Sequence, residues 1–261
     1  MKAKRTTTVQ SCQRLAEGVY DLRLVYETDP GEVLPGQFVG VYSKDSARRL
    51  PRPISIAGYD PKGKVLRLVF RVVGAGTEEF SHLKAGETVD VLGILGNGYD
   101  LSVLSGRKVL LLGGGIGAPP MLCLAKALHS LPGTEVIAVL GYRTNDLFLA
   151  DEFEKVSKVV IATDDGTAGF HGNVVEAVRA QNLPADVICA CGPLPMLRGV
   201  KALSEERQVP CFLSLEERMA CGVGVCLGCV TKTTKVDAHS HVKNARICTE
   251  GPVFNAEDVE I

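Results

Sequence analysis

The chain has 261 residues, of which 46% are hydrophobic and 23% charged, a composition typical of a folded globular protein rather than a disordered one. Its 29 basic and 30 acidic residues give a net charge of −1, and only 5% of the residues are aromatic, so no nucleic-acid partner is expected. The chain also has nine cysteines. Without a visible export signal, an odd number favours free thiols or metal ligands over a disulfide framework.

The first part of the chain, residues 1–102, consists of short β-rich runs separated by glycine-rich turns. The predicted strands cover residues 19–26, 37–42, 65–72 and 87–92, and a further strand is expected to begin near Arg52. Short strands with regular turn signals predict a small antiparallel β-barrel. We therefore expect residues 1–102 to form one domain.

The pattern then changes to alternating strands and helices over residues 103–215. The predicted strands are 108–112, 136–140, 159–162, 185–190 and 209–215, and the predicted helices are 121–130, 147–155, 173–181 and 195–207. The first of these strands is a continuous apolar run, as expected of a strand that is covered on both faces. This alternation predicts an α/β domain with a doubly wound parallel sheet.

No segment is expected to cross a membrane. The longest uncharged apolar stretch, residues 109–125, contains four glycines and two prolines. A spanning helix needs about 20 apolar residues with unbroken backbone hydrogen bonding. The N-terminal residues lack the apolar core of a secretory signal, so a cytoplasmic protein is expected.

The strongest motif lies in residues 216–261, which we predict to be a small cysteine-rich domain. Cys221, Cys226 and Cys229 follow the spacing C-x4-C-x2-C, and Cys248 follows after C-x18-C. This is the plant-type spacing of [2Fe–2S] ligands. The intervening glycines allow backbone N–H groups to approach the sulfur atoms and stabilise a charged cluster.

Two other metal sites are compatible with these cysteines. A zinc site could recruit His239 or His241, but zinc modules more often pair two C-x2-C units, and only one is present. A Rieske cluster uses histidine in place of two cysteines, and the sequence has no Cys-x-His pair. Four other cysteines are expected to be small buried apolar residues: Cys12, Cys123, Cys189 and Cys211.

Two motifs suggest a bound nucleotide. Arg52-Pro53-Ile54-Ser55 places a guanidinium for a pyrophosphate close to a hydroxyl, although a surface turn is the simpler interpretation. The segment from Gly113 to Ala118 follows a strand, opens a helix and fits G-x-G-x-x-A, which brings phosphate to a helix N-terminus. The next strand ends in Gly141-Tyr142-Arg143 rather than in the usual acidic residue, so a glycine-rich turn without a ligand stays open.

A third motif, Cys191-Gly192-Pro193, follows a predicted parallel strand. Ligands bind at the carboxyl ends of such strands, so a thiol there would line a nicotinamide pocket. A structural turn is the alternative.

In this order the motifs resemble the ferredoxin–NADP reductase superfamily over roughly residues 5–215. The segments that carry the resemblance are Pro35-Gly36-Gln37-Phe38, Arg52-Pro53-Ile54-Ser55, the Gly113 loop and Cys191-Gly192-Pro193. The following segment, Glu216 to Cys226, is similar to the electron-transfer subunits of NAD-dependent (class 1B) dihydroorotate dehydrogenases.

This resemblance implies three cofactors and their sites. FAD would lie across the barrel and contact Arg52, Pro53, Ile54, Ser55, Val69, Phe70, Arg71, Gly76 and Thr77. NAD(H) would bind at Gly113, Gly115, Gly117, Cys191, Gly192 and Pro193, and a [2Fe–2S] cluster at Cys221, Cys226, Cys229 and Cys248. The wider superfamily often has Tyr where this chain has Ile54, and its C-terminal aromatic residue over the flavin is replaced here by the cluster segment.

The resemblance also implies a partner and a reaction. Electrons would pass between NAD(H), FAD, the cluster and the FMN of a TIM-barrel-like catalytic subunit, in a heterotetramer of two copies of each chain. Dihydroorotate would be oxidised to orotate and NAD⁺ reduced, in pyrimidine biosynthesis. No acid or base residue of this chain is needed, because the cofactors carry the chemistry.

Other functions are compatible with the same motifs. Similar subunits occur in NADH-dependent ferredoxin:NADP transhydrogenases, hydrogenases and sulfide dehydrogenases. The transhydrogenase type tends to use Asp as one cluster ligand, whereas four cysteines are available here. A redox-inactive, zinc-bearing module is the alternative from another class of protein.

Overall fold

The computed structural model describes residues 3–237 and 241–261, which form two compact units. One unit contains the chain up to Gly98 together with Glu216–Thr231 and Ala245–Pro252. The other contains Tyr99–Leu215, Lys232–Asn244 and Val253–Ile261. Residues 216–261 thus contribute to both units, and their boundaries as a separate domain stay a prediction.

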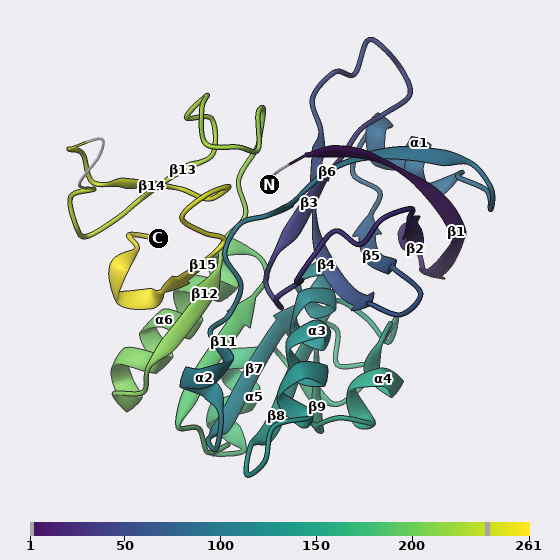
Figure 1. Cartoon of the computed structure of the whole chain (residues 1–261). Coiled ribbons are helices and arrows are strands. Elements are labelled where there is room, and N and C mark those ends of the chain that lie inside the picture. The colour runs from purple at the N-terminus through teal and green to yellow at the C-terminus, as the bar shows by residue number, and fades with distance from the viewer. Residues whose placement is uncertain (1–2, 238–240) are drawn as a thin grey trace. The chain divides into compact units, whose positions relative to one another are not determined.

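The first unit is built on a closed antiparallel barrel with the strand order β1-β2-β5-β4-β3-β6, as the sequence predicts (Figure 1). Its strands are β1 (Lys4–Ala16), β2 (Val19–Tyr26), β3 (Phe38–Val41), β4 (Arg52–Asp60), β5 (Val65–Arg71) and β6 (Thr88–Leu95). The sequence did not predict β1, which is the longest of them. Its register shifts after Val9 and after Arg14, and these irregularities break the apolar alternation that marks a strand.

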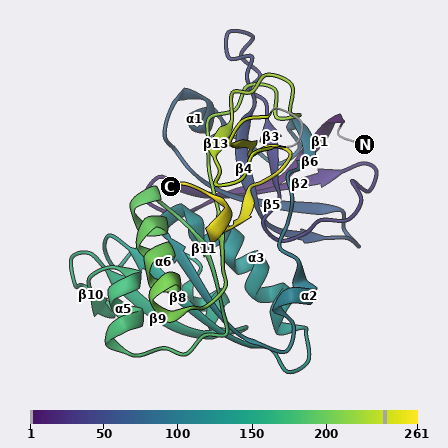
Figure 2. The same cartoon turned by 90° about the vertical axis from the view of Figure 1, so that its left-hand side faces the viewer.

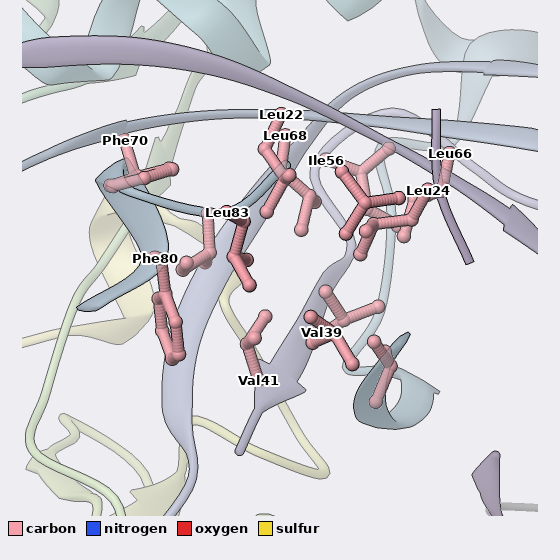
Figure 3. Close-up of a cluster of buried hydrophobic side chains, with 14 of the residues drawn as sticks. Leu22, Leu24, Val39, Val41, Ile56, Leu66, Leu68, Phe70, Phe80 and Leu83 are labelled. Atoms are coloured by element: carbon pink, nitrogen blue, oxygen red, sulfur yellow. The ribbon is translucent and has the colours of Figure 1, made fainter. Parts of the chain in front are cut away.

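The barrel is filled by aliphatic side chains that alternate along its strands (Figure 3). Leu66, Leu68 and Phe70 of β5 point inward at every second position. A short helix, α1 (Ala75–Ser81), adds Phe80, whose ring packs edge-to-face on Phe70 with centroids 6.2 Å apart. This burial holds α1 against the barrel, although a helix of two turns in a glycine-rich segment has no clear sequence signal.

The second unit is a seven-stranded sheet with the order β10-β9-β8-β7-β11-β12-β15. Its strands are β7 (Lys108–Gly114), β8 (Glu135–Tyr142), β9 (Lys158–Thr163), β10 (Phe170–His171), β11 (Val187–Cys191), β12 (Cys211–Ser214) and β15 (Val253–Asn255). All neighbours are parallel except β15, which pairs antiparallel with β12. The predicted parallel, doubly wound sheet is therefore confirmed.

Helices cover this sheet on both faces. They are α2 (Leu101–Leu104), α3 (Ala118–His129), α4 (Ala150–Glu154), α5 (Val174–Ala180) and α6 (Leu194–Arg207). Strands β8 and β9 follow β7 towards one edge of the sheet, whereas β11 and β12 lie on the other side of β7. Right-handed crossovers therefore place α3 and α4 on one face and α5 and α6 on the other. Figure 2 shows α5 and α6 side by side, in agreement with their contacts.

Short elements complete the chain. They are the 3₁₀ turns η1 (Gly115–Gly117) and η2 (Ala256–Asp258) and the hairpin strands β13 (Val230–Lys232) and β14 (Asn244–Arg246). Helix α3 begins three residues earlier than predicted, because Pro119 and Pro120 occupy its first turn, where no N–H donor is needed. Among the described residues, no helix has both the length and the apolar character that crossing a membrane requires.

Candidate functional site

Two of the predicted flavin segments meet at the end of the barrel. Arg52 is the first residue of β4, and its guanidinium lies directly over Gly76 in the first turn of α1. A Cβ atom on Gly76 would stand only 2.3 Å from Nε of Arg52, so a side chain there would displace the guanidinium from this position. The guanidinium therefore lies beside the first turn of α1, and a guanidinium in this position suits the diphosphate of FAD.

Thr77 stabilises this turn through the hydrogen bonds of its side chain. Its hydroxyl donates to the Gly74 carbonyl (2.9 Å) and accepts hydrogen bonds from the backbone N–H groups of Val73 (2.9 Å) and Gly74 (3.2 Å). The side chain is buried, and its bonding capacity is used inside the turn. Its contribution to a ligand site is thus to fix the backbone next to Gly76.

The other predicted flavin residues divide between the two faces of their strands. Ile54 and Phe70 belong to the buried barrel core, so their side chains fill the barrel. Pro53 is exposed and Ser55 half-buried, and both lie on the opposite face of β4. Val69 is buried outside that core cluster, and Arg71 is half-buried at the end of β5.

In the α/β unit, the glycine-rich loop and the Cys191-Gly192 turn are packed against each other. The last residues of β7 and β11 are paired in register, Gly113 with Cys191. A Cβ atom on Gly117 would stand 2.1 Å from the Cys191 carbonyl oxygen, so this glycine is required for backbone packing. The structure thus brings both predicted nicotinamide segments to the carboxyl edge of the sheet, where nucleotides bind in such folds.

Two thiols of this sheet, those of Cys189 and Cys211, are buried and hold their protons at neutral pH. Burial raises the pKa of Cys211 to about 12 and holds that of Cys189 well above its usual value. Cys191 is also fully buried, so its thiol forms part of the interior. The prediction of buried apolar cysteines is confirmed for Cys189 and Cys211, whereas Cys12 and Cys123 are only partly buried.

The cysteine loop brings its thiols together in two pairs. The side chain of Cys226 donates a hydrogen bond to Cys221, and the side chains of Cys229 and Cys248 are hydrogen-bonded to each other. A [2Fe–2S] cluster takes two thiolates on each iron, so two neighbouring pairs match its requirement. This pairing is compatible with the predicted ligand set, and the assignment of the four cysteines as cluster ligands stays a prediction.

Backbone amides of the loop point at the sulfur atoms. The N–H groups of Val223, Val225 and Cys226 each donate to Sγ of Cys221 at 3.4 Å, and Gly228 N–H donates to Sγ of Cys226 at 3.4 Å. The loop can turn its amides inward because φ is positive at Gly222 (+67°) and Gly224 (+89°), a region in which glycine is unstrained.

These hydrogen bonds change the chemistry of Cys221. Burial raises the pKa of its thiol, but the loop amides and Cys226 outweigh burial and lower that pKa to about 6. The thiolate is the form that binds metal, so the loop prepares this sulfur as a ligand. Cys248 differs, because burial and the hydrogen bond with Cys229 raise its pKa to about 12. Its thiol must lose a proton when metal binds.

Arg246 connects the segment of Cys248 to the loop. Nη1 of Arg246 donates to the Gly224 carbonyl at 3.1 Å, and its Nε donates to the Glu250 carboxylate at 2.9 Å. Ile247 N–H also donates to the Cys229 carbonyl at 2.9 Å. The sequence analysis missed both Arg246 and Glu250, although two opposite charges on either side of Cys248 were a usable signal.

The zinc alternative gains no support from the described residues. Within residues 3–237 and 241–261, no three His, Cys, Asp or Glu side chains gather closely enough to bind a single metal ion. His241 is exposed in the segment between β13 and β14, and His239 lies outside the described residues.

Comparison with known proteins identifies the sequence family. The profile of the iron-sulfur cluster binding domain of dihydroorotate dehydrogenase B matches residues 216–260. The electron transfer subunit of dihydroorotate dehydrogenase B (NAD(+)) from Enterococcus faecalis is 40% identical over 97% of this chain and 96% of its own length. The subunit of the same name from Listeria monocytogenes is 43% identical over 95% of both chains.

Solved structures agree on the fold. The structure of an NADH-dependent reduced ferredoxin–NADP oxidoreductase, described in connection with flavin-based electron bifurcation, superposes with a TM-score of 0.86 at 31% identity. It covers 97% of this chain, and 89% of that chain is matched. A cytochrome P450 reductase from Amycolatopsis superposes with a TM-score of 0.70 at 26% identity, over 80% of this chain and 68% of its own.

The relatives match nearly the whole chain, and the profile matches its cysteine segment. The chain therefore belongs to the family of electron transfer subunits of dihydroorotate dehydrogenase B (NAD(+)).

Proposed function

We propose that this chain carries electrons between NAD(H) and the FMN of a dihydroorotate dehydrogenase catalytic subunit, by way of bound FAD and a [2Fe–2S] cluster. The paired thiols are the observation that carries the proposal. Cys221 with Cys226 and Cys229 with Cys248 supply two ligands for each iron, with amide donors aimed at the sulfur atoms. The membership of the chain in its family supports this function.

The cofactors supply the redox chemistry: a flavin exchanges two electrons with a nicotinamide, and a binuclear cluster carries one electron at a time. The residues of the chain bind and orient these groups. Arg52 and the turn at Gly76 and Thr77 hold the FAD diphosphate, because a guanidinium and a helix start both attract anions. The remaining flavin contacts are those that the resemblance to the ferredoxin–NADP reductase superfamily assigns to residues 53–55 and 69–71.

The carboxyl edge of the sheet is the proposed NAD(H) site. Gly117 allows the loop that contains Gly113 and Gly115 to lie against Cys191-Gly192, and this packing is so close that a side chain on Gly117 would collide with the Cys191 carbonyl. The nucleotide would then be bound mainly by backbone groups of this edge and by the start of α3.

The partner would dock at the cysteine loop. Val223, Val225 and Leu227 alternate with glycine and cysteine residues, and their exposed fractions are 37%, 80% and 57%. Exposed apolar side chains grouped around Cys226, itself exposed, are typical of a contact surface rather than of a solvated loop. A catalytic subunit that covers them would bring its FMN towards the cluster and exclude water from it. We further propose two copies of each subunit and a cytoplasmic complex.

Purification under anaerobic conditions tests this function directly. We expect two irons, two acid-labile sulfides and one FAD per chain, as the proposed cofactors require. Adding NADH should reduce the FMN of the catalytic subunit only when this chain is present. A colourless protein without iron, sulfide and flavin would refute the proposal.

A second candidate function follows from one solved structure. This chain superposes on a bifurcating ferredoxin–NADP oxidoreductase with a TM-score of 0.86 at 31% identity. A reductase subunit whose partner is ferredoxin is therefore the second candidate. Reduction of ferredoxin or NADP⁺ by the complex, without dihydroorotate, would favour this second function.

A further inference from the structure

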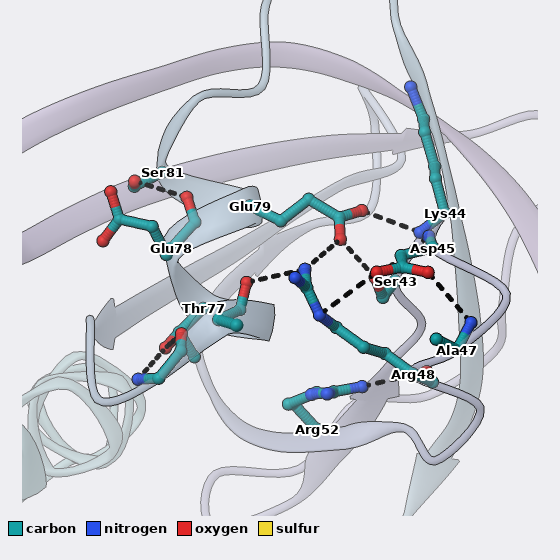
Figure 4. A network of polar contacts seen from close by, with 12 residues as sticks. Ser43, Lys44, Asp45, Ala47, Arg48, Arg52, Thr77, Glu78, Glu79 and Ser81 are labelled. Atoms are coloured by element: carbon teal, nitrogen blue, oxygen red, sulfur yellow. Dashed lines mark hydrogen bonds and ion pairs between the residues drawn. The ribbon is translucent and has the colours of Figure 1, made fainter.

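Glu79 of α1 binds a loop on which the flavin site depends (Figure 4). Its carboxylate accepts a hydrogen bond from the Lys44 backbone N–H at 2.7 Å and another from the Ser43 hydroxyl. It also pairs with the guanidinium of Arg48 at 3.3 Å. The carboxylate is 23% exposed, so these three donors, rather than water, provide much of its solvation.

The same loop holds Arg52 from the other side. The carbonyl oxygens of Arg48 and Leu50 accept hydrogen bonds from Nη1 of Arg52, at 3.2 and 2.5 Å. In the described part of the chain, Nε and Nη2 of Arg52 have no hydrogen-bond partner. These two nitrogens lie over Gly76, and a Cβ atom there would be 2.3 Å from Nε and 2.9 Å from Nη2.

Arg48 connects the two contacts. Its side chain bonds to Glu79 and to the Ala75 carbonyl of α1 (3.1 Å), while its own carbonyl holds Arg52. Residues 43–50 contain no regular secondary structure, so side-chain contacts such as these, together with the ion pair of Lys44 and Glu87 at 3.2 Å, hold the loop in place. Without them, the long side chain of Arg52 would lose its fixed acceptors and sample several rotamers.

We propose that Glu79 is a positioning residue for the diphosphate of FAD. It fixes the loop of residues 43–50, so that the loop carbonyls engage Nη1 and turn the free Nε and Nη2 edge of Arg52 towards the anion. This inference rests on the proposed FAD site and adds to it a residue that does not touch the ligand. A carboxylate is required because all three partners of Glu79 are donors; an amide would face one of them with its own N–H₂ group.

The test measures flavin affinity on the deflavinated full chain. Dissociation constants for FAD and for riboflavin, which has no phosphate, are measured for wild type, Glu79→Gln, Arg52→Ala and the double variant. We expect Glu79→Gln to weaken FAD binding about tenfold, as for the loss of a charge-assisted hydrogen bond, and to leave riboflavin binding unchanged. The double variant should bind FAD no more weakly than Arg52→Ala, because Glu79 acts through Arg52.

Glu78→Gln is the matched control. Glu78 is the neighbouring residue on α1, and it pairs with His82 at the exposed side, away from the loop (Figure 4). The same chemical change at this position should alter neither affinity. Thermal unfolding of each deflavinated variant shows that the barrel is intact.

The outcomes separate this inference from the proposed function. If Arg52→Ala weakens FAD binding and Glu79→Gln does not, the positioning role is wrong while the FAD site stands. Equal weakening of FAD and riboflavin by Glu79→Gln would also overturn it, since that result marks a general loss of structure. If wild type binds no FAD, the proposed function itself fails. Should Glu79→Gln not fold, Ser43→Ala removes one donor only, and unchanged FAD affinity in that variant overturns the inference.

Discussion

The cysteines of this chain fall into two regions with opposite chemistry. In the loop of residues 221–229, backbone amides donate to sulfur and lower the pKa of Cys221 to about 6. In the parallel sheet, Cys189 and Cys211 lie among apolar side chains, and burial raises the pKa of Cys211 to about 12. The same side chain is therefore easier to ionise in one region and harder to ionise in the other, and the difference comes from the nearby N–H donors.

Removing a loop thiol should have the largest effect. Cys226→Ser leaves one iron with a single cysteine ligand, so we expect loss of the cluster and loss of electron delivery to the catalytic subunit. NADH-driven reduction of an artificial acceptor at FAD should survive. Iron and acid-labile sulfide analysis checks the first expectation and steady-state assays the second.

Cys211→Ser is the matched change in the sheet. It should leave the iron content unchanged, because Cys211 is a core residue of the sheet. If both variants lost iron equally, the two regions would not differ as described.

Gly224→Ala tests the backbone of the loop. Gly224 has φ +89°, and an added Cβ atom would stand 2.7 Å from Cγ2 of Thr249. We expect a cost of about 1–3 kcal/mol, which would be seen as faster loss of iron to a chelator. Gly228→Ala is the control, because φ there is not positive and the nearest atom to an added Cβ, Sγ of Cys226, is at 3.4 Å.

Arg246→Gln should loosen the contact between the loop and the segment of Cys248. The bond to the Gly224 carbonyl would be weakened and Glu250 would lose its cationic partner, at a cost of about 1–2 kcal/mol. The expected result is a several-fold faster release of iron, with altered cluster signals in electron paramagnetic resonance spectra. Identical spectra and release rates would show that the loop holds its geometry without this ion pair.

The smallest expected effect is the contribution of the buried sheet thiols to the pH dependence of the free energy of unfolding. Burial raises the pKa of Cys211 in the folded chain to about 12, whereas an ordinary exposed thiol has a pKa of about 9.0. The unfolded chain therefore releases this proton first, and the free energy of unfolding falls as the pH rises from about 9 towards 12. At pH 9.5 the expected loss is about 1 kcal/mol, and Cys211→Ala should reduce the slope of a denaturant series measured between pH 8 and 10.

Much of this molecule could be predicted from local sequence, and the remainder depends on contacts between distant residues. The strand–helix alternation and the cysteine spacing are local patterns, so the parallel sheet and Cys221, Cys226 and Cys229 were predicted. The long strand β1 was missed because its irregular register hides the alternation.

The contacts that hold the site together depend on the folded chain in the same way. The resemblance assigned Gly76 to the flavin site, but only the folded barrel brings the guanidinium of Arg52 over it. The glycine-rich motif pointed to Gly117, whereas its close approach to the Cys191 carbonyl is seen only in the structure. Arg246 and Glu250 were missed because their contacts join residues that are distant in the sequence or lie outside any known motif.

The pairing of β12 with β15 has a consequence for how the cysteine segment is held. Ser214, just before that segment, is in register with Val253, just after it, so the excursion leaves and rejoins the sheet at adjoining positions. Strand hydrogen bonds hold its two ends together, so the sheet offsets part of the entropy lost in closing this long loop. The cysteine segment is thus an insertion whose two ends are joined through neighbouring strands of one sheet.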